Sequence, residues 1–178
     1  MVIVLLANGF EELEALTPVD VMRRHNIDVR TVSVTREKLV TGTHGIQVMA
    51  DLLGEEVPLN EISMLILPGG MPGVKNLEIA PLTHALIDAV LHNGGRLAAI
   101  CAAPSIFGKH GMLTNINATC FPGFESELLN ANVLDERVVT DGIFTTAKDY
   151  TCAAEFTEEL IGILEREENA KNEAITEG

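Results

Sequence analysis

Short, continuous apolar runs alternate with longer amphipathic stretches along this chain. The runs predict strands that are buried on both faces of a sheet, and apolar stripes at helical spacing predict helices. The predicted strands are Val2–Ala7, Asp28–Val34, Ser63–Leu67, Leu97–Ile100, Val133–Val139 and Ile143–Thr146, and the predicted helices are Glu11–His25, Ile79–His92, Asp149–Glu167 and a short one ending near Gly108. A hairpin or bent excursion is expected over Leu39–Asp51, where Thr41-Gly42-Thr43-His44-Gly45 separates two short runs.

The alternation of strands and helices predicts an α/β fold, with a mainly parallel sheet and helices on both of its faces. We expect a single domain over residues 1–167. Residues 168–178 are mostly acidic and polar, and we expect them to form an acidic, frayed C-terminal tail. In folds of this class, ligands gather outside the carboxyl ends of the strands.

The composition narrows the class of partner. A formal net charge of −14 argues against nucleic-acid phosphate or an anionic membrane as a main partner, and solubility explains the acidity better than steering of a cationic partner. No apolar run approaches a membrane span, and the first residues lack the basic region of a signal peptide. Three widely spaced cysteines without a CxxC pair fit a reducing compartment, so we expect a cytoplasmic location.

An apolar run ends at Cys101 and is followed at once by Ala102, Ala103 and Pro104. This pattern fits a strand that turns sharply into a helix, because proline is tolerated in the first turn of a helix. A thiol at a helix N-terminus faces the positive end of the helix dipole, which lowers the thiol pKa and favours the thiolate. Cys101 is therefore a candidate nucleophile, and a buried structural cysteine is the alternative.

Two other segments end at the same edge of the predicted sheet. Glu14 lies one turn inside the helix that follows the first strand. A carboxyl group beside a thiolate is driven towards its protonated form, in which it donates a hydrogen bond to sulfur. Gly69 and Gly70 follow another strand, and such a turn can present backbone N–H groups as an oxyanion hole; ordinary turn formation is the alternative.

The spacing of the histidines indicates no metal site. None of the five belongs to an H-x-H or H-E-x-x-H pattern, so we expect no bound metal. His44 stands out because it lies in a glycine-flanked loop, and it is a candidate for the rim of the site. Glu11 and Glu12 open a helix, where the helix dipole favours negative charge, and this explains them better than a catalytic role.

Four motifs occur in a fixed order along the chain. They are Gly9-Phe10-Glu11-Glu12-Leu13-Glu14, Pro18-Val19-Asp20-Val21-Met22-Arg23-Arg24, Leu67-Pro68-Gly69-Gly70 and Ala98-Ala99-Ile100-Cys101-Ala102-Ala103-Pro104. This set resembles the ThiJ/PfpI superfamily, and the likeness extends from Val2 to about Phe156. The most similar branch is the one that contains the Parkinsonism-associated protein deglycase.

The resemblance implies a flavodoxin-like three-layer sandwich, a homodimer and no cofactor. It also implies that Cys101 is reactive, that a protonated Glu14 is hydrogen-bonded to it, and that Gly70 supplies an oxyanion-type N–H. Members of this branch are described as cofactor-independent glyoxalases, as deglycases, as chaperones and as oxidative-stress sensors. The residues expected in the substrate-binding rim are Gly69, Ala102, Phe121, His44 and Arg24.

The chain departs from the family pattern close to the cysteine. Ala102 stands where the protease-like branch has a histidine, and Phe121 stands where animal deglycases have one. No imidazole base is therefore expected from either place. His44 aligns with a basic residue of the family's hairpin, and we expect it with Arg24 near the dimer interface. Lys148-Asp149-Tyr150 replaces a Gly-Pro-Gly turn, a change that can reshape the rim of the pocket.

Taken together, the residues and the resemblance predict an enzyme for small-molecule aldehydes or glycated adducts. The Cys101 thiolate would add to the aldehyde, Gly70 would stabilise the oxyanion, and Glu14 would transfer a proton, giving a hydroxy acid such as lactate. One alternative is a redox-sensing chaperone with little turnover, because an accessible low-pKa cysteine is also readily oxidised. A hydrolase is a further alternative, against which Ala102 and Phe121 count.

Overall fold

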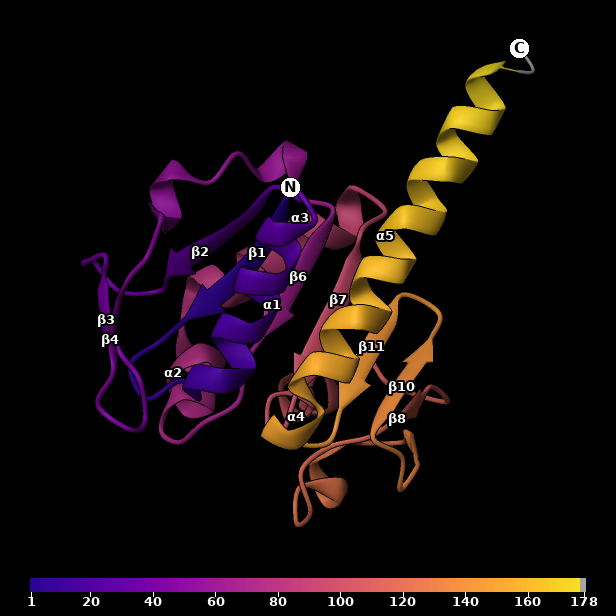
Figure 1. Cartoon of the computed structure of the whole chain (residues 1–178). Coiled ribbons are helices and arrows are strands. Elements are labelled where there is room, and N and C mark those ends of the chain that lie inside the picture. The colour runs from indigo at the N-terminus through magenta and orange to yellow at the C-terminus, as the bar shows by residue number, and fades with distance from the viewer. Residues whose placement is uncertain (177–178) are drawn as a thin grey trace.

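A seven-stranded, mostly parallel sheet forms the centre of the computed structural model, which describes residues 1–176 (Figure 1). The strand order is β10-β11-β7-β6-β1-β2-β5, and β10 alone in this sheet runs antiparallel to its neighbour. The strands of the sheet are β1 (Val2–Leu6), β2 (Val29–Ser33), β5 (Leu52–Leu53), β6 (Met64–Leu67), β7 (Arg96–Ile100), β10 (Val138–Asp141) and β11 (Phe144–Ala147). Two small pairs lie outside it, β3 (Leu39–Thr41) with β4 (Gln47–Met49) and β8 (Asn117–Ala118) with β9 (Asn132–Val133).

Helices cover both faces of the sheet (Figure 1). One face carries α1 (Glu12–Arg24) and α5 (Ala153–Thr176), which pack against each other. The opposite face carries α2 (Gly73–Ile79), α3 (Pro81–His92) and α4 (Pro104–Lys109). Short 3₁₀ turns lie at Gly54–Glu56, Leu59–Glu61, Glu125–Glu127 and Tyr150–Cys152. The predicted α/β fold with helices on both faces is confirmed.

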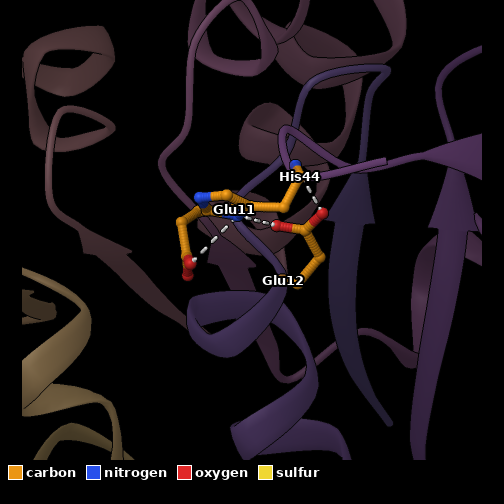
Figure 2. A group of neighbouring side chains, drawn as sticks. All are labelled: Glu11, Glu12 and His44. Carbon is orange, nitrogen blue, oxygen red and sulfur yellow. Dashed lines mark hydrogen bonds and ion pairs between the residues drawn. The ribbon is translucent and has the colours of Figure 1, made fainter. Parts of the chain in front are cut away.

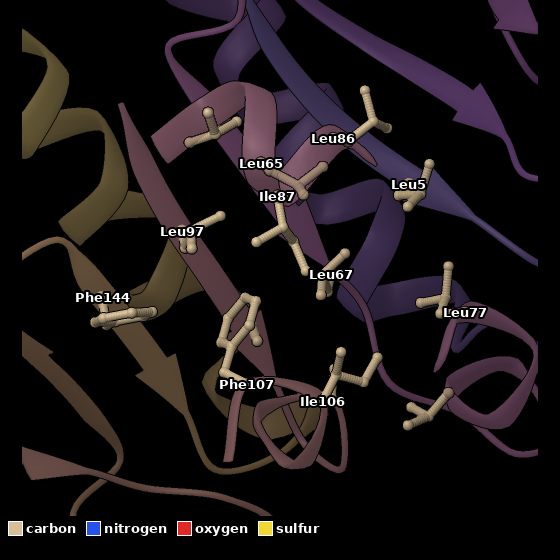
Figure 3. Close-up of a cluster of buried hydrophobic side chains, with 14 of the residues drawn as sticks. Leu5, Leu65, Leu67, Leu77, Leu86, Ile87, Leu97, Ile106, Phe107 and Phe144 are labelled. Carbon is tan, nitrogen blue, oxygen red and sulfur yellow. The ribbon is translucent and has the colours of Figure 1, made fainter. Parts of the chain in front are cut away.

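The strand β1 shows how the apolar runs build two cores. Val2, Val4 and Leu6 face α1 and α5, whereas Ile3 and Leu5 face the other layer, because successive side chains of a strand point to opposite faces. Figure 3 shows the second layer, in which Leu5, Leu65, Leu67 and Leu97 of the strands meet Leu86, Ile87, Ile106 and Phe107 of the helices. A continuous apolar run is thus what a central strand with two covered faces needs.

The structure changes the sequence-based expectations for α2, β10 and α5, and it decides between the two alternatives for Leu39–Asp51. The helix α2 fills a stretch for which no element was predicted, and β10 begins only at Val138, so the expected strand Val133–Val139 is mostly irregular. The excursion Leu39–Asp51 contains the antiparallel pair β3–β4 and is a hairpin. The helix α5 continues to Thr176 through most of the stretch expected to fray, and residues 177 and 178 lie outside the described residues.

The loops that follow β1 and β6 touch through their backbones. Gly70 has φ +93°, and a Cβ there would lie 2.4 Å from the backbone nitrogen of Glu11 and 2.5 Å from the carbonyl oxygen of Gly9. Gly9 has φ +87° and would meet the ring of Pro72 at 2.5 Å. The Gly73 N–H donates to the Gly9 carbonyl at 3.1 Å. Only glycine fits this crossing, because both the backbone conformation and the distance exclude a side chain.

We predict that Gly70→Ala lowers the free energy of unfolding by about 3 kcal/mol or more, since it combines left-handed strain with backbone overlap. Gly142→Ala is the matched control, because Gly142 also has a positive φ but no atom within 4 Å of a built Cβ. The control should lose about 1 kcal/mol. Urea unfolding of both variants measures the difference, and equal losses would contradict the close contact at Gly70.

Candidate active site

Cys101 lies at a sharp turn between β7 and α4. Its φ of +65° is in the left-handed region, which costs a non-glycine residue about 1–2 kcal/mol. Two hydrogen bonds hold the residue there: its N–H donates to the Ala147 carbonyl at 2.9 Å, and its carbonyl accepts from the Phe121 N–H at 2.8 Å. Pro104 opens α4 directly after the turn. This geometry matches the strand–turn–helix elbow that exposes nucleophiles in other α/β enzymes.

The Glu14 side chain is buried against this turn. Its exposed fraction is 1%, and its carboxyl group is hydrogen-bonded to the Cys101 thiol. Glu14 Oε2 also accepts a hydrogen bond from the Gly69 N–H at 2.9 Å. A Cβ on Gly69 would lie 2.5 Å from this oxygen and 3.1 Å from Cys101 Sγ, so glycine leaves the room in which the carboxyl and thiol meet. The sequence-based expectation that these three residues lie together is met by the geometry.

Backbone N–H groups converge on the Cys101 sulfur. The N–H groups of Gly70 and Ala102 both lie near it and favour its ionised form. Ala102 itself is 3% exposed, and its methyl group packs in the core. Two donors aimed at one position can stabilise a negative charge on sulfur or on an oxygen bonded next to it.

Burial raises the pKa of both acids. Burial first, and then the negative charge of Glu11, raise the pKa of Glu14 to about 7. Burial and the Glu14 carboxylate raise the pKa of the Cys101 thiol, whereas the sequence predicts a lowered thiol pKa from the helix N-terminus. The difference arises because α4 is short and the thiol is buried next to a second acid. The pair therefore titrates as a unit that carries one negative charge, not two.

Glu11, Glu12 and His44 lie together at the start of α1, where Glu12 is hydrogen-bonded to His44 and Glu11 Oε1 lies 4.0 Å from His44 Nδ1 (Figure 2). Glu12 Oε1 accepts from the His44 N–H at 2.7 Å, and Glu12 Oε2 lies 2.7 Å from His44 Nδ1. Burial alone would raise the pKa of Glu12, but its hydrogen bonds to His44 lower it. The same contact with Glu12 raises the pKa of His44. The β3–β4 hairpin is thereby fastened to the helix that carries Glu14.

The same cluster is where a cation would find ligands. Within residues 1–176, the ligand atoms of Glu11, Glu12 and His44 all lie within 4.8 Å of one another. These atoms are engaged in hydrogen bonds, and the N-terminus of α1 repels positive charge. Spacing along the sequence could not reveal the cluster, because His44 comes from a hairpin 32 residues further along the chain.

The remaining rim residues lie at different distances from Cys101 and Glu14. The backbone of Phe121 is hydrogen-bonded to Cys101. The half-exposed ring of Phe121 packs near Phe124. Arg24 lies in the last turn of α1, ten residues past Glu14, and is paired with Asp20 at 2.9 Å. The structure therefore does not bring Arg24 to Cys101 within one chain. Asp149 is a charged neighbour whose carboxylate also raises the pKa of Glu14.

A surface cavity of about 440 Å³ lies along the two segments that hold Cys101. One segment surrounds Phe121, and the other follows Ala147, the residue whose carbonyl accepts the Cys101 N–H. The lining residues are Thr119, Cys120, Pro122, Glu125, Val133, Leu134, Asp135 and Lys148. Lys148 is ion-paired with Asp135, so the replacement of a Gly-Pro-Gly turn by Lys148-Asp149-Tyr150 puts charge on this wall.

The fold and the elbow define an α/β sandwich with a cysteine-centred site at the carboxyl ends of its parallel strands. Residues 1–163 match the model of the DJ-1/PfpI family, and the chain belongs to this family. Protein DJ-1 homolog B of Arabidopsis thaliana is 33% identical over 171 residues, covering 95% of this chain but only 39% of that protein. A Pyrococcus abyssi protein named as a deglycase is 30% identical over 149 residues, covering 83% of this chain and 89% of that protein.

The structural comparison agrees with the family assignment. The structure of Toxoplasma gondii DJ-1, described as oxidized, superposes on this chain with a TM-score of 0.87 at 31% identity. The match covers 98% of this chain and 96% of that chain. The predicted family and the predicted fold class are confirmed.

Over residues 1–176, no helix combines the length and the apolar character that crossing a membrane requires.

We predict that alkylation of Cys101 by iodoacetamide rises with pH around the value of about 7 at which the pair loses its first proton. In Glu14→Gln no carboxylate accepts the thiol proton, and burial leaves the thiol pKa above the value of about 8.5 for free cysteine. Alkylation of that variant should therefore follow the thiol alone, with one midpoint above about 8.5 and no rise around 7. Peptide mapping of the modified cysteine provides the rate, and identical pH profiles for the two proteins would contradict the coupling.

Proposed function

We propose that this chain is a cysteine-dependent enzyme that acts on reactive carbonyl compounds, of the cofactor-independent glyoxalase or deglycase type. The observation that carries the proposal is the buried Glu14 carboxyl group hydrogen-bonded to a cysteine at a left-handed elbow. A structural cysteine would need neither the strained backbone nor a buried acid beside it. The deglycase name of the archaeal relative supports the same class of substrate.

The geometry supports a sequence of proton transfers around one covalent bond. The Cys101 sulfur attacks the aldehyde carbon of methylglyoxal while the thiol proton passes to the Glu14 carboxylate. The carbonyl oxygen gains the electron pair and accepts a hydrogen bond from the Gly70 N–H. Glu14 gives this proton to the former carbonyl oxygen, which completes a hemithioacetal and restores the Glu14 carboxylate. The carboxylate then removes the proton of the former aldehyde carbon and delivers it to the neighbouring carbon, while the hydroxyl proton passes to the ketone oxygen, which leaves a thioester. Water hydrolyses this thioester, releasing lactate and the free thiol.

Two substrate sizes fit this scheme. Free methylglyoxal or glyoxal needs only the pair and its N–H donors. An early glycation adduct carries the same carbonyl attached to a larger group, and the cavity beside Phe121 offers room for that group. We expect no metal and no organic cofactor in either reaction, because the sulfur, the carboxyl group and the backbone N–H supply each proton and charge the scheme requires.

We predict that Cys101→Ser abolishes lactate formation from methylglyoxal, with a loss of at least about a hundredfold, because a serine hydroxyl is a far weaker nucleophile without a strong base. Cys152→Ser is the control, since Cys152 is 0% exposed and does not line the cavity beside Phe121. Its turnover should stay near that of the unmodified protein. An enzymatic assay of lactate measures the turnover of both variants, and full activity of Cys101→Ser would refute the mechanism.

The second candidate function is a redox sensor or chaperone with little turnover in an oxidative-stress response. The described oxidized state of the Toxoplasma gondii relative favours this possibility. Brief peroxide treatment followed by intact-mass measurement should add two oxygen atoms, about 32 Da, at Cys101 if the thiol is a sensor. Selective oxidation together with negligible lactate formation would favour sensing, whereas turnover without selective oxidation would favour the enzyme. A hydrolase remains the least supported function, because Ala102 and Phe121 provide no imidazole.

The homodimer and the cytoplasmic location stay predictions. Leu13 on α1 and Ile46 and Met49 on the β3–β4 hairpin are 54%, 53% and 65% exposed, and this apolar surface supports self-association. The free cysteines support a reducing compartment. The acidic net charge supports small molecules, in preference to nucleic acid or membrane, as the partners.

A further inference from the structure

Glu11 takes part in a closed ring of hydrogen bonds with Gly69 and Glu14. The Glu11 N–H donates to the Gly69 carbonyl at 2.9 Å, and the Gly69 N–H donates to Glu14 Oε2 at 2.9 Å. The ring closes where the Glu14 N–H donates to Glu11 Oε2 at 2.7 Å. Each of the three residues thus gives its backbone N–H to the next one. The ring fixes the Glu14 backbone and its carboxyl group on the same turn.

We propose that Glu11 is a positioning residue for Glu14. It holds Glu14 over the Gly69–Gly70 turn and faces the Glu14 carboxyl group with a negative charge that is only distantly paired with His44. The inference rests on the proposed function for its consequence in catalysis, although the arrangement itself is independent of any substrate. The ring gives Glu11 the first of these roles. The second follows from how the neighbouring charges are paired.

The charge of Glu12 is paired closely with His44, whereas that of Glu11 is paired only at a longer distance. Both Glu12 oxygens accept hydrogen bonds from His44, through the backbone N–H and through Nδ1. Glu11 Oε1 lies 4.0 Å from His44 Nδ1, and its other oxygen is bonded to a neutral N–H. The dipole of α1 favours negative charge at this end of the helix.

Several groups face the Glu14 carboxyl from the surrounding elements. Glu11 on α1 and Asp149 after β11 are negative and oppose its ionisation, and the Gly69 N–H after β6 favours it. The fourth group is the Cys101 thiol at the elbow, whose hydrogen bond favours the carboxylate. Glu11 exerts the largest effect among the charged neighbours. Removing its charge should therefore make the pair lose its first proton at a lower pH.

The test compares the pH midpoint of Cys101 alkylation in variants that keep the helix cap. Glu11→Gln retains an oxygen that can accept the Glu14 N–H but lacks the charge. Its midpoint should fall by about one pH unit. Glu12→Gln is the matched control, because it removes the adjacent carboxylate, and its midpoint should move much less.

A second pair of variants guards against misfolding of Glu11→Gln. Asp and Asn are both good helix N-caps of nearly equal size, so Glu11→Asp and Glu11→Asn differ essentially in charge. Only the Asn variant should show the lowered midpoint. Equal midpoints for Asp and Asn, or equal shifts for Glu11→Gln and Glu12→Gln, would overturn the proposal.

The alkylation test of Glu11 and the lactate test of the proposed function can succeed or fail independently. Alkylation is measured without substrate, so a shift in Glu11→Gln supports the positioning role even if Cys101→Ser still forms lactate. An unshifted midpoint removes the role of Glu11 even if lactate formation depends fully on Cys101. In an active enzyme, the pH profile of kcat should shift with the alkylation midpoint, which loss of helix stability alone would not cause.

Discussion

The burial of the Glu14 carboxyl group against the Cys101 thiol is the constraint on which the rest of this site depends. Two acids held in contact away from water cannot both ionise, so together they carry one charge whose proton can move between oxygen and sulfur. Other features serve this contact. Gly69 leaves space for it, the left-handed φ of Cys101 turns the thiol towards it, and Glu11 fixes the helix that brings the carboxyl group.

The parallel sheet is what allows segments far apart in the chain to meet. The strands β1, β6 and β7 lie side by side, and the three segments that follow them carry Glu14, Gly69 and Cys101. The backbone crossing at Gly70 locks two of these segments together, and the hydrogen bond from Cys101 to Ala147 adds the neighbouring strand β11. A rigid sheet edge thus positions the groups, as expected for a site of an α/β fold.

Much of this arrangement could be predicted from the sequence, because it depends on local patterns. Apolar runs located the central strands, and strand ends located Glu14, Gly69, Gly70 and Cys101. The direction of the thiol pKa was wrong, since it is set by burial and by Glu14 rather than by the short helix α4. The Glu12–His44 pair and the ring through Glu11 depend on tertiary contacts that spacing cannot reveal. The helix α2 was missed because the glycine- and proline-rich turn before it resembles a loop.

The most direct test of this account is a ¹³C NMR titration of the Glu14 carboxyl carbon in the intact protein, assigned with Glu14→Gln. The account predicts a midpoint near 7, with the pair carrying one charge above it. In Cys101→Ala the Glu14 midpoint should change, because its partner in sharing the proton is gone. A Glu14 midpoint at the ordinary value of 4.5 that does not respond to loss of the thiol would contradict the account.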